Sequence, residues 1–195
     1  MTIHSRFHKT LVLLAAGSVL AAAVPPLAAA DVFKARMLTG KAPIEPPIVD
    51  VRIEVESWTT MEEVLRLQQL TSQGDIQPFL NAFNAMNKGV VRFMYARGFN
   101  LPIRCAVTVP TEKGKRVSLF MYRENWQTGS VKTRGRNYFM VIEFTLNEKG
   151  KGSGRFYEDA MIKLDPNMGR VELDSYGAAP KMFSSVQEVK KAAGK

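Results

Sequence analysis

The segment Tyr138–Leu146 constrains the fold most, because it carries apolar side chains on both faces of a strand. Side chains in a β-strand alternate between the two faces of the sheet. One face carries Tyr138, Met140, Ile142, Phe144 and Leu146, and the other carries Phe139, Val141, Glu143 and Thr145. A strand that is apolar on both faces must be covered on both. The sequence therefore predicts either a curled sheet with helices packed outside it, or a flatter sheet between a helix pair and another layer.

A strand followed by a helix is expected earlier in the chain. Apolar and polar residues alternate strictly over Val49–Glu56, which indicates a strand with one buried face. Thr59 and Thr60 lie three residues before Glu62 and Glu63. This spacing makes two overlapping capping boxes, in which the threonine and the carboxylate satisfy each other's backbone amides. The sequence thus predicts a helix from this point to the vicinity of residue 74.

A second helix is expected to begin at Asp75, a good N-cap residue, and to end at Gly89. Its apolar residues, at helical spacing, are Ile76, Phe79, Leu80, Phe83 and Met86. Alternation and turn residues predict further strands at 90–95, 103–109, 116–123, 138–147, 154–164, 170–176 and 181–186. Short turns between consecutive strands favour antiparallel pairing.

The predicted fold class is α+β, an antiparallel β meander of about seven or eight strands, forming a curled sheet or partial barrel, with a two-helix insertion after the first strand. Residues 1–30 are expected to be a signal peptide and residues 31–48 an extended proline-rich lead-in. Residues 49–187 are expected to form a single α+β domain. Residues 188–195 are expected to be a basic tail.

The first thirty residues have the pattern of an export signal. Arg6 and Lys9 are followed by the apolar run Leu11–Val24, which is too short to span a bilayer. Three alanines then precede Asp31, which is the small-residue pattern of a cleavage site. The protein is therefore expected in the periplasm or outside the cell, with no transmembrane segment after cleavage.

Cleavage of this signal also removes the histidines on which most familiar catalytic sites depend. Both histidines, His4 and His8, lie within it, and Cys105 is the single cysteine. Serine or cysteine triads and zinc or copper sites normally require these residue types. We therefore expect no catalytic residue, no bound metal and no cofactor. Cys105 lies in an apolar run and is predicted to be a small buried hydrophobe.

Four residues are candidates for a ligand site: Glu143, Arg155, Tyr157 and Trp126. Glu143 lies between apolar neighbours, so it is predicted to be buried or to face the lumen of the sheet. Arg155, on the next strand, is a candidate partner. The pair is either a satisfied ion pair or the polar anchor of a ligand cavity. Tyr157 and Trp126 lie near basic loops.

The basic loops suggest an anionic partner. The chain has a formal net charge of +9. The loop cations are Lys113, Lys115, Arg116, Lys132, Arg134, Arg136, Lys149, Lys151 and Arg155. If these loops meet at one end of the sheet, they form a positive rim suited to anionic lipid or polysaccharide. The alternative is that each loop is simply solvated.

Gly150, Gly152 and Gly154 resemble the glycines of a phosphate-binding loop. Such a loop precedes a helix, whereas the residues after Gly154 alternate as a strand. A hairpin turn between two strands is the expected structure here.

One segment resembles a group of exported bacterial proteins of unknown function. It comprises residues 138–147, the three glycines that follow, and residues 160–165; Trp58 and the strand before it fit the same group. The resemblance implies export and a single domain, and it implies no activity.

The sequence favours a non-catalytic binding module for a hydrophobic or amphipathic ligand. The alternative is an envelope protein that docks on anionic lipid or polysaccharide through its basic loops. A third hypothesis is a histidine-free enzyme that uses Glu143 with a lysine or tyrosine. Nucleic acid is not an expected partner.

Overall fold

The computed structural model describes residues 30–39, 47–71, 75–95, 100–122, 138–165, 170–175 and 179–189. These residues form two helices, α1 (Met61–Thr71) and α2 (Ile76–Ala85). The strands are β1 (Asp31–Leu38), β2 (Ile48–Val55), β3 (Gly89–Phe93), β4 (Asn100–Ile103), β5 (Cys105–Thr111), β6 (Gly114–Tyr122), β7 (Tyr138–Asn147), β8 (Lys151–Asp165), β9 (Arg170–Ser175) and β10 (Lys181–Val189). The α+β class is confirmed. Neither described helix is both long and apolar enough to cross a membrane.

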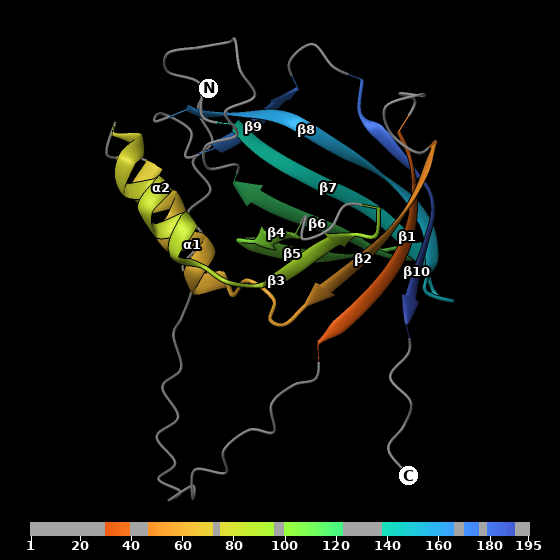
Figure 1. The fold of residues 1–195 in the computed structure, drawn as a ribbon. Helices are drawn as coiled ribbons and strands as arrows, with labels where there is room; N and C mark the ends of the chain where they lie inside the picture. Colours follow the sequence, from red (N-terminus) through yellow and green to blue (C-terminus); the bar gives the residue numbers. More distant parts are fainter. Residues whose placement is uncertain are drawn as a thin grey trace, which may run out of the picture.

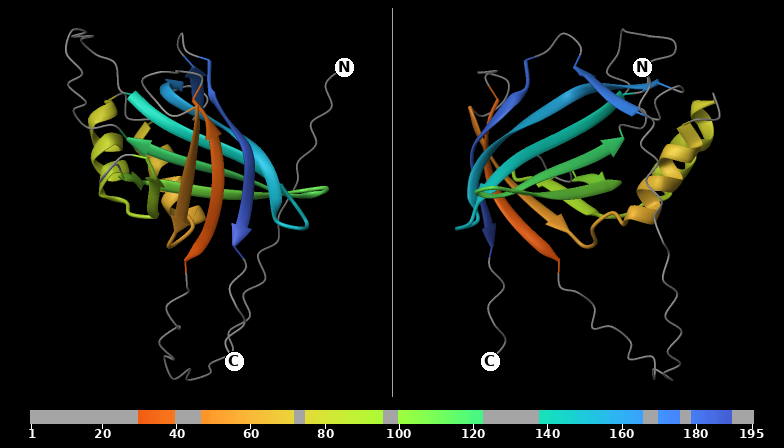
Figure 2. Two further views of the ribbon diagram at one scale, coloured as in Figure 1. Left: turned by 45° about the vertical axis from the view of Figure 1, so that its right-hand side comes forward. Right: turned by 180° about the vertical axis from the view of Figure 1, so that it is seen from behind.

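The strands form one antiparallel sheet that curls until its two edges nearly meet (Figure 1, Figure 2). Their order is β4-β3-β2-β1-β10-β8-β7-β6-β5, and β9 pairs with β8. Only Arg104 separates β4 from β5, so the two edge strands are halves of one continuous segment. The Arg104 amide donates to the Phe120 carbonyl, at 2.9 Å. The predicted curled sheet is confirmed, with ten strands where about seven or eight were expected.

The segment expected to be a lead-in contains a central strand. β1 pairs with β2 on one side and β10 on the other, and its side chains Phe33, Ala35 and Met37 are buried. Those three residues alternate with polar ones, whereas the prolines of the lead-in begin only at Pro43. The first described strand thus begins at Asp31, whereas the sequence predicted that strands begin at Val49. At the other end, β10 runs to Val189, beyond the limit expected for the domain.

The inner face of the curled sheet encloses the larger of two hydrophobic clusters. Side chains from β1 to β8 and from β10 fill the enclosed space, with the rings of Phe33 and Phe144 at 5.1 Å between centroids. Lys115 lies over the Phe33 ring, at 5.7 Å, and pairs with Glu188 at 2.6 Å. The sheet therefore curls around a lumen, as predicted, and apolar side chains fill that lumen.

The second cluster joins the helices to the outer face of the sheet, where Figure 2 shows them lying outside the strands. Phe79, Leu80 and Phe83 of α2 are buried against Phe139 and Val141 of β7. Both faces of β7 are thus covered, as its sequence predicts. Of the two predicted arrangements, the structure has the curled sheet with helices outside.

Both helices begin at the expected caps. The Thr60 amide donates to the Glu63 carboxylate at 2.8 Å, and the Glu63 amide donates to Thr60 Oγ1 at 3.2 Å. Asp75 accepts from the Gln77 amide at 2.9 Å. α2 ends at Ala85, earlier than expected, and Gly89 instead begins β3 with a φ of 133°.

Candidate functional site

The predicted carboxylate Glu143 lies on the outer face of β7. Met140, Ile142 and Phe144, which alternate with it, join the inner cluster. The expectation that Glu143 faces the lumen is therefore wrong, because the strand turns its other face inward. Glu143 is opposite its candidate partner Arg155 in the register, and it accepts a hydrogen bond from Ser118 Oγ at 3.4 Å.

Two other predicted site residues, Arg155 and Tyr157, lie on the same outer face, on the neighbouring strand β8. Arg155 is exposed, and Tyr157 is half-buried in the cluster beneath the helices. Trp126 lies outside the described residues, as do the loop cations Lys132, Arg134 and Arg136. Among the remaining loop cations, Lys115 is paired with Glu188. Glu143, Arg155 and Tyr157 are thus neighbours on the outer face of β7 and β8.

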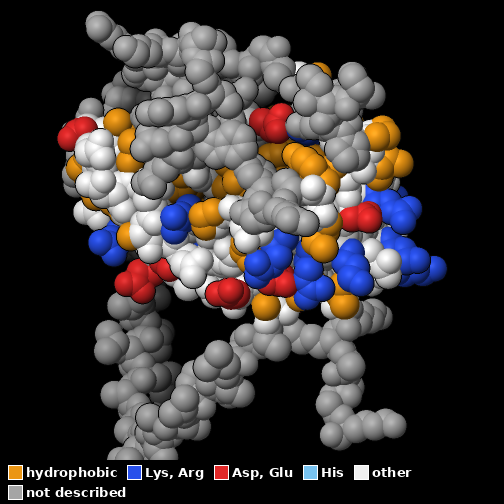
Figure 3. Space-filling view, in the orientation of Figure 1, with side chains coloured by type: hydrophobic (Ala, Val, Ile, Leu, Met, Phe, Trp, Pro, Cys, Tyr) orange, Lys and Arg blue, Asp and Glu red, His pale blue; other side chains and the backbone are white. Residues whose placement is uncertain are grey.

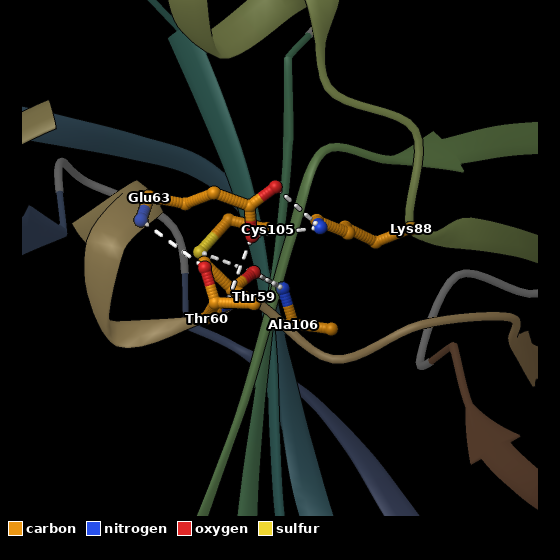
Figure 4. A network of polar contacts seen from close by, with 6 residues as sticks. All are labelled: Thr59, Thr60, Glu63, Lys88, Cys105 and Ala106. Atoms are coloured by element: carbon orange, nitrogen blue, oxygen red, sulfur yellow. Dashed lines mark hydrogen bonds and ion pairs between the residues drawn. The ribbon is translucent and has the colours of Figure 1, made fainter. Parts of the chain in front are cut away.

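A polar network joins the start of α1 to the sheet (Figure 4). Lys88 Nζ lies 2.7 and 2.8 Å from the two carboxylate oxygens of Glu63. This contact, with the Thr60 amide, holds the pKa of Glu63 below its ordinary value. The carboxylate therefore stays ionised and serves as both the cap of α1 and the counter-ion of a buried lysine.

Cys105 lies in the same network. The Thr59 hydroxyl accepts from the Ala106 amide at 2.9 Å and donates to the Cys105 sulfur at 3.4 Å. Burial raises the pKa of the Cys105 thiol, so the reactive thiolate is disfavoured. The predicted burial of this cysteine is confirmed. The network therefore fixes the helix pair onto β5 and offers no activated nucleophile.

A groove of about 770 Å³ crosses the outer face of β1, β2 and β10 and reaches β8. We call it the basic groove and define it by Lys34, Arg36, Asp50, Arg52, Lys151 and Gln187. Four of these six side chains are cationic and one is a carboxylate. Figure 3 shows the Lys and Arg side chains gathered over β1, β2 and β10, on the lower right of the molecule.

The strand register aligns most of these cations in one row. Lys34 is opposite Arg52 on β2 and Gln187 on β10, and Gln187 is opposite Lys151 on β8. Arg92 of β3 extends the row beyond Arg52. We call Arg92, Arg52, Lys34, Gln187 and Lys151 the basic row. Like charges placed directly opposite each other destabilise a sheet, so compensating anions stabilise such a row.

The protein supplies only part of that compensation. Glu54 accepts from Arg52 Nε at 2.6 Å and from Arg92 at 3.0 Å, and these contacts lower its pKa. Arg36 and Asp50 are paired at 3.4 Å, but both are about two-thirds exposed, so the pair is weak. Lys34 and Lys151 have no carboxylate partner among the described side chains. The middle of the groove is therefore positively charged.

The sequence pointed to Lys151 as a loop cation but did not predict the other residues of the groove. Lys34 and Arg36 lie in the segment that was expected to be a lead-in. The alternation in Val32–Leu38 was the signal that could have placed them on the solvent face of a strand.

No family model, no curated protein and no solved structure matches this chain.

Proposed function

We propose that this protein is a non-catalytic binding module whose basic groove holds the anionic group of an amphipathic ligand. The observation that carries the proposal is the basic row, which sets four cations and one amide side by side across five strands. The volume of the groove, about 770 Å³, is in the range of small-molecule sites.

The chemistry of the groove favours a phosphate or carboxylate group. Lys34 stands at the centre of the row, between Arg52 and Gln187. Ammonium, guanidinium and amide groups all donate hydrogen bonds, and donors that are charged make the stronger bonds to anions. An anion between them relieves the repulsion that the empty row carries.

An apolar side chain at the edge of the groove favours a ligand that is also partly apolar. Met94 follows β3, lines the groove and is 66% exposed. Its backbone amide donates to the Asp50 carbonyl at 3.0 Å, which fixes it beside β2. A flexible methionine side chain at this position can pack against an alkyl chain whose head group lies on Lys34.

The groove residues provide no catalytic arrangement. General acid–base or nucleophilic catalysis requires a nucleophile within reach of a base. The described groove residues offer cations, an amide and the exposed Asp50, which is paired with Arg36. Ser185 also lines the groove, and among the described side chains no base is hydrogen-bonded to its hydroxyl. Binding without reaction is the function that these groups support.

A pair of single-chain amphiphiles tests this function. Octyl phosphate and octyl glucoside carry the same alkyl chain, and only the first is anionic. Isothermal titration below their critical micelle concentrations should give saturable binding of octyl phosphate alone. The affinity should fall with added salt, because exposed charges are screened.

Two charge-matched variants locate the site. Lys34→Gln with Lys151→Gln removes two cations from the groove and should weaken octyl phosphate binding about tenfold or more. Lys113→Gln with Arg116→Gln removes two exposed cations elsewhere and should leave the affinity unchanged. Absence of octyl phosphate binding, or equal weakening by both variants, would refute the proposal.

We further propose that the chain is exported and processed after Ala30. β1 begins at Asp31, so this cut leaves β1 whole. Asp31 is itself held by Trp58, whose Nε1 donates to its carboxylate at 2.9 Å. N-terminal sequencing of exported protein should start at Asp31, and a start at Met1 would contradict the proposal.

A further inference from the structure

Three exposed apolar side chains lie in one cross-strand row beside the basic groove. Leu38 of β1 is opposite Ile48 of β2 and Met182 of β10. Their exposed fractions are 43%, 55% and 43%. We call these three residues the apolar row. Scattered apolar side chains are normal on a protein surface, and contiguous ones are candidates for an interaction site.

The apolar row and the basic groove occupy the same face of the sheet. Leu38, Arg36 and Lys34 alternate with the buried side chains of β1, so all three point outward. Residues two apart in a strand are separated by about 7 Å, which places Arg36 about 7 Å and Lys34 about 13 Å from Leu38. At the β8 side of the apolar row, Arg155 is opposite Met182. The apolar row is thus bordered by cations on two sides.

We infer that the partner is an anionic lipid bilayer, which the apolar row enters while the cations bind the head groups. This inference rests on the proposed function, because it identifies the source of the anion as a lipid head group. The head-group layer on each side of a bilayer is about 5–8 Å thick. With the apolar row at the edge of the hydrocarbon, Arg36 lies among the phosphates. Arg155 is level with the apolar row and extends its long side chain towards them. Lys34 lies just outside them, where its long side chain can still reach inward.

The charges on this face disfavour a second copy of the chain as the occupant. A symmetric dimer places the same surface of each subunit against itself. The basic rows of the two copies would then lie close together, and their like charges would repel. An anionic bilayer instead offers charge opposite to Arg36, Lys34 and Arg155.

Vesicle co-sedimentation tests the inference. Wild-type protein should bind phosphatidylcholine vesicles that contain phosphatidylglycerol, and should not bind vesicles of phosphatidylcholine alone. A triple variant, Leu38→Ser, Ile48→Ser and Met182→Ser, should lose about tenfold or more in partitioning to the anionic vesicles. Because its groove is intact, the triple variant should bind octyl phosphate within about twofold of wild type.

A matched control removes three exposed apolar side chains elsewhere, by Met61→Ser, Leu65→Ser and Val109→Ser. It should sediment with anionic vesicles as wild type does. The groove variant Lys34→Gln with Lys151→Gln should weaken both vesicle and octyl phosphate binding about tenfold or more. Thermal melts by circular dichroism show that each variant is folded.

The outcomes separate the two proposals. If wild type binds octyl phosphate but no vesicles, the bilayer inference fails and the proposed function stands. If it does not bind octyl phosphate, the proposed function fails.

Three further results would contradict the bilayer inference alone. Equal vesicle binding by wild type and triple variant would show that the apolar row does not insert into the bilayer. A dimer in sedimentation velocity that the triple variant abolishes would assign the apolar row to a second copy. Binding of dextran sulfate without vesicle binding would assign the groove to a polysaccharide. The dimer result and the dextran sulfate result would each overturn the bilayer inference.

Discussion

Lys88 Nζ contacts both carboxylate oxygens of Glu63, yet the two partners differ in burial: the lysine side chain is 8% exposed and the glutamate 35%. Glu63→Ala leaves a buried ammonium without a counter-ion. Lys88→Met leaves a carboxylate that water can still reach. We therefore expect Glu63→Ala to lower the free energy of unfolding by about 2–3 kcal/mol and Lys88→Met by about 1 kcal/mol. Urea unfolding followed by circular dichroism measures both, and the reverse order would contradict this account.

The same pair predicts a pH dependence of stability. Lys88 lowers the pKa of Glu63 below its ordinary value of 4.5 in the folded state. A carboxyl whose pKa is lowered by folding stabilises the fold fully above its unfolded pKa, and loses that contribution as the pH falls through its folded pKa. The stability difference between wild type and Glu63→Gln should thus be constant near neutral pH and shrink below pH 4.5. Unfolding curves at a series of pH values test this, and a difference that persists in strong acid would exclude it.

Local patterns in the sequence predicted both helices and all the strands except β1 and β4. The two apolar faces of Tyr138–Leu146 correctly predicted that both sides of this strand are buried by other elements. The capping residues Thr60 and Asp75 correctly predicted where the two helices begin. These signals are local because each depends on side-chain periodicity or on a hydrogen bond within one turn.

The basic groove could not be predicted in the same way. Its cations Lys34 and Lys151 lie on strands far apart in the sequence and are brought together by the register of β1, β10 and β8. Register between distant strands depends on packing of the whole core, which no local pattern encodes. Glu143 illustrates the same limit, because its strand is apolar on both faces and periodicity alone could not say which face turns inward.

Gly152 should tolerate no larger residue. A Cβ atom built there would lie 1.7 Å from the carbonyl oxygen of Thr145, on the neighbouring strand β7. Gly152→Ala must push β8 away from β7, and we expect a loss of about 3 kcal/mol or more, or failure to fold. The adjacent exposed residue provides the control, since Ser153→Ala should change stability by less than about 0.5 kcal/mol. Equal stability of the two variants would show that the strands do not approach this closely.

Cys105 should be inert in the folded protein. Its side chain is 7% exposed, and burial raises the pKa of its thiol, so little thiolate is available. Iodoacetamide at mildly alkaline pH should leave the native protein unlabelled and should label it once in denaturing urea. Intact-protein mass spectrometry reads both states, and rapid labelling of the native protein would contradict the burial.

Phe139 should anchor the helix pair to the sheet. Its side chain is fully buried, and its ring lies 5.5 Å from Phe83 and 6.4 Å from Phe79, both on α2. Phe139→Ala removes these contacts and should lower the free energy of unfolding by about 3–5 kcal/mol. Phe144→Ala, on the inner face of the same strand, should cost a similar amount.

The two phenylalanine variants should differ in where the protein loosens. Phe139 belongs to the cluster beneath the helices, whereas Phe144 packs against Phe33 of β1 in the inner cluster. Amide hydrogen exchange should therefore accelerate in α1 and α2 of Phe139→Ala while β1 and β2 keep their protection. In Phe144→Ala the strands should lose protection as well. Uniform acceleration in Phe139→Ala would show that the helices and the sheet unfold as one unit.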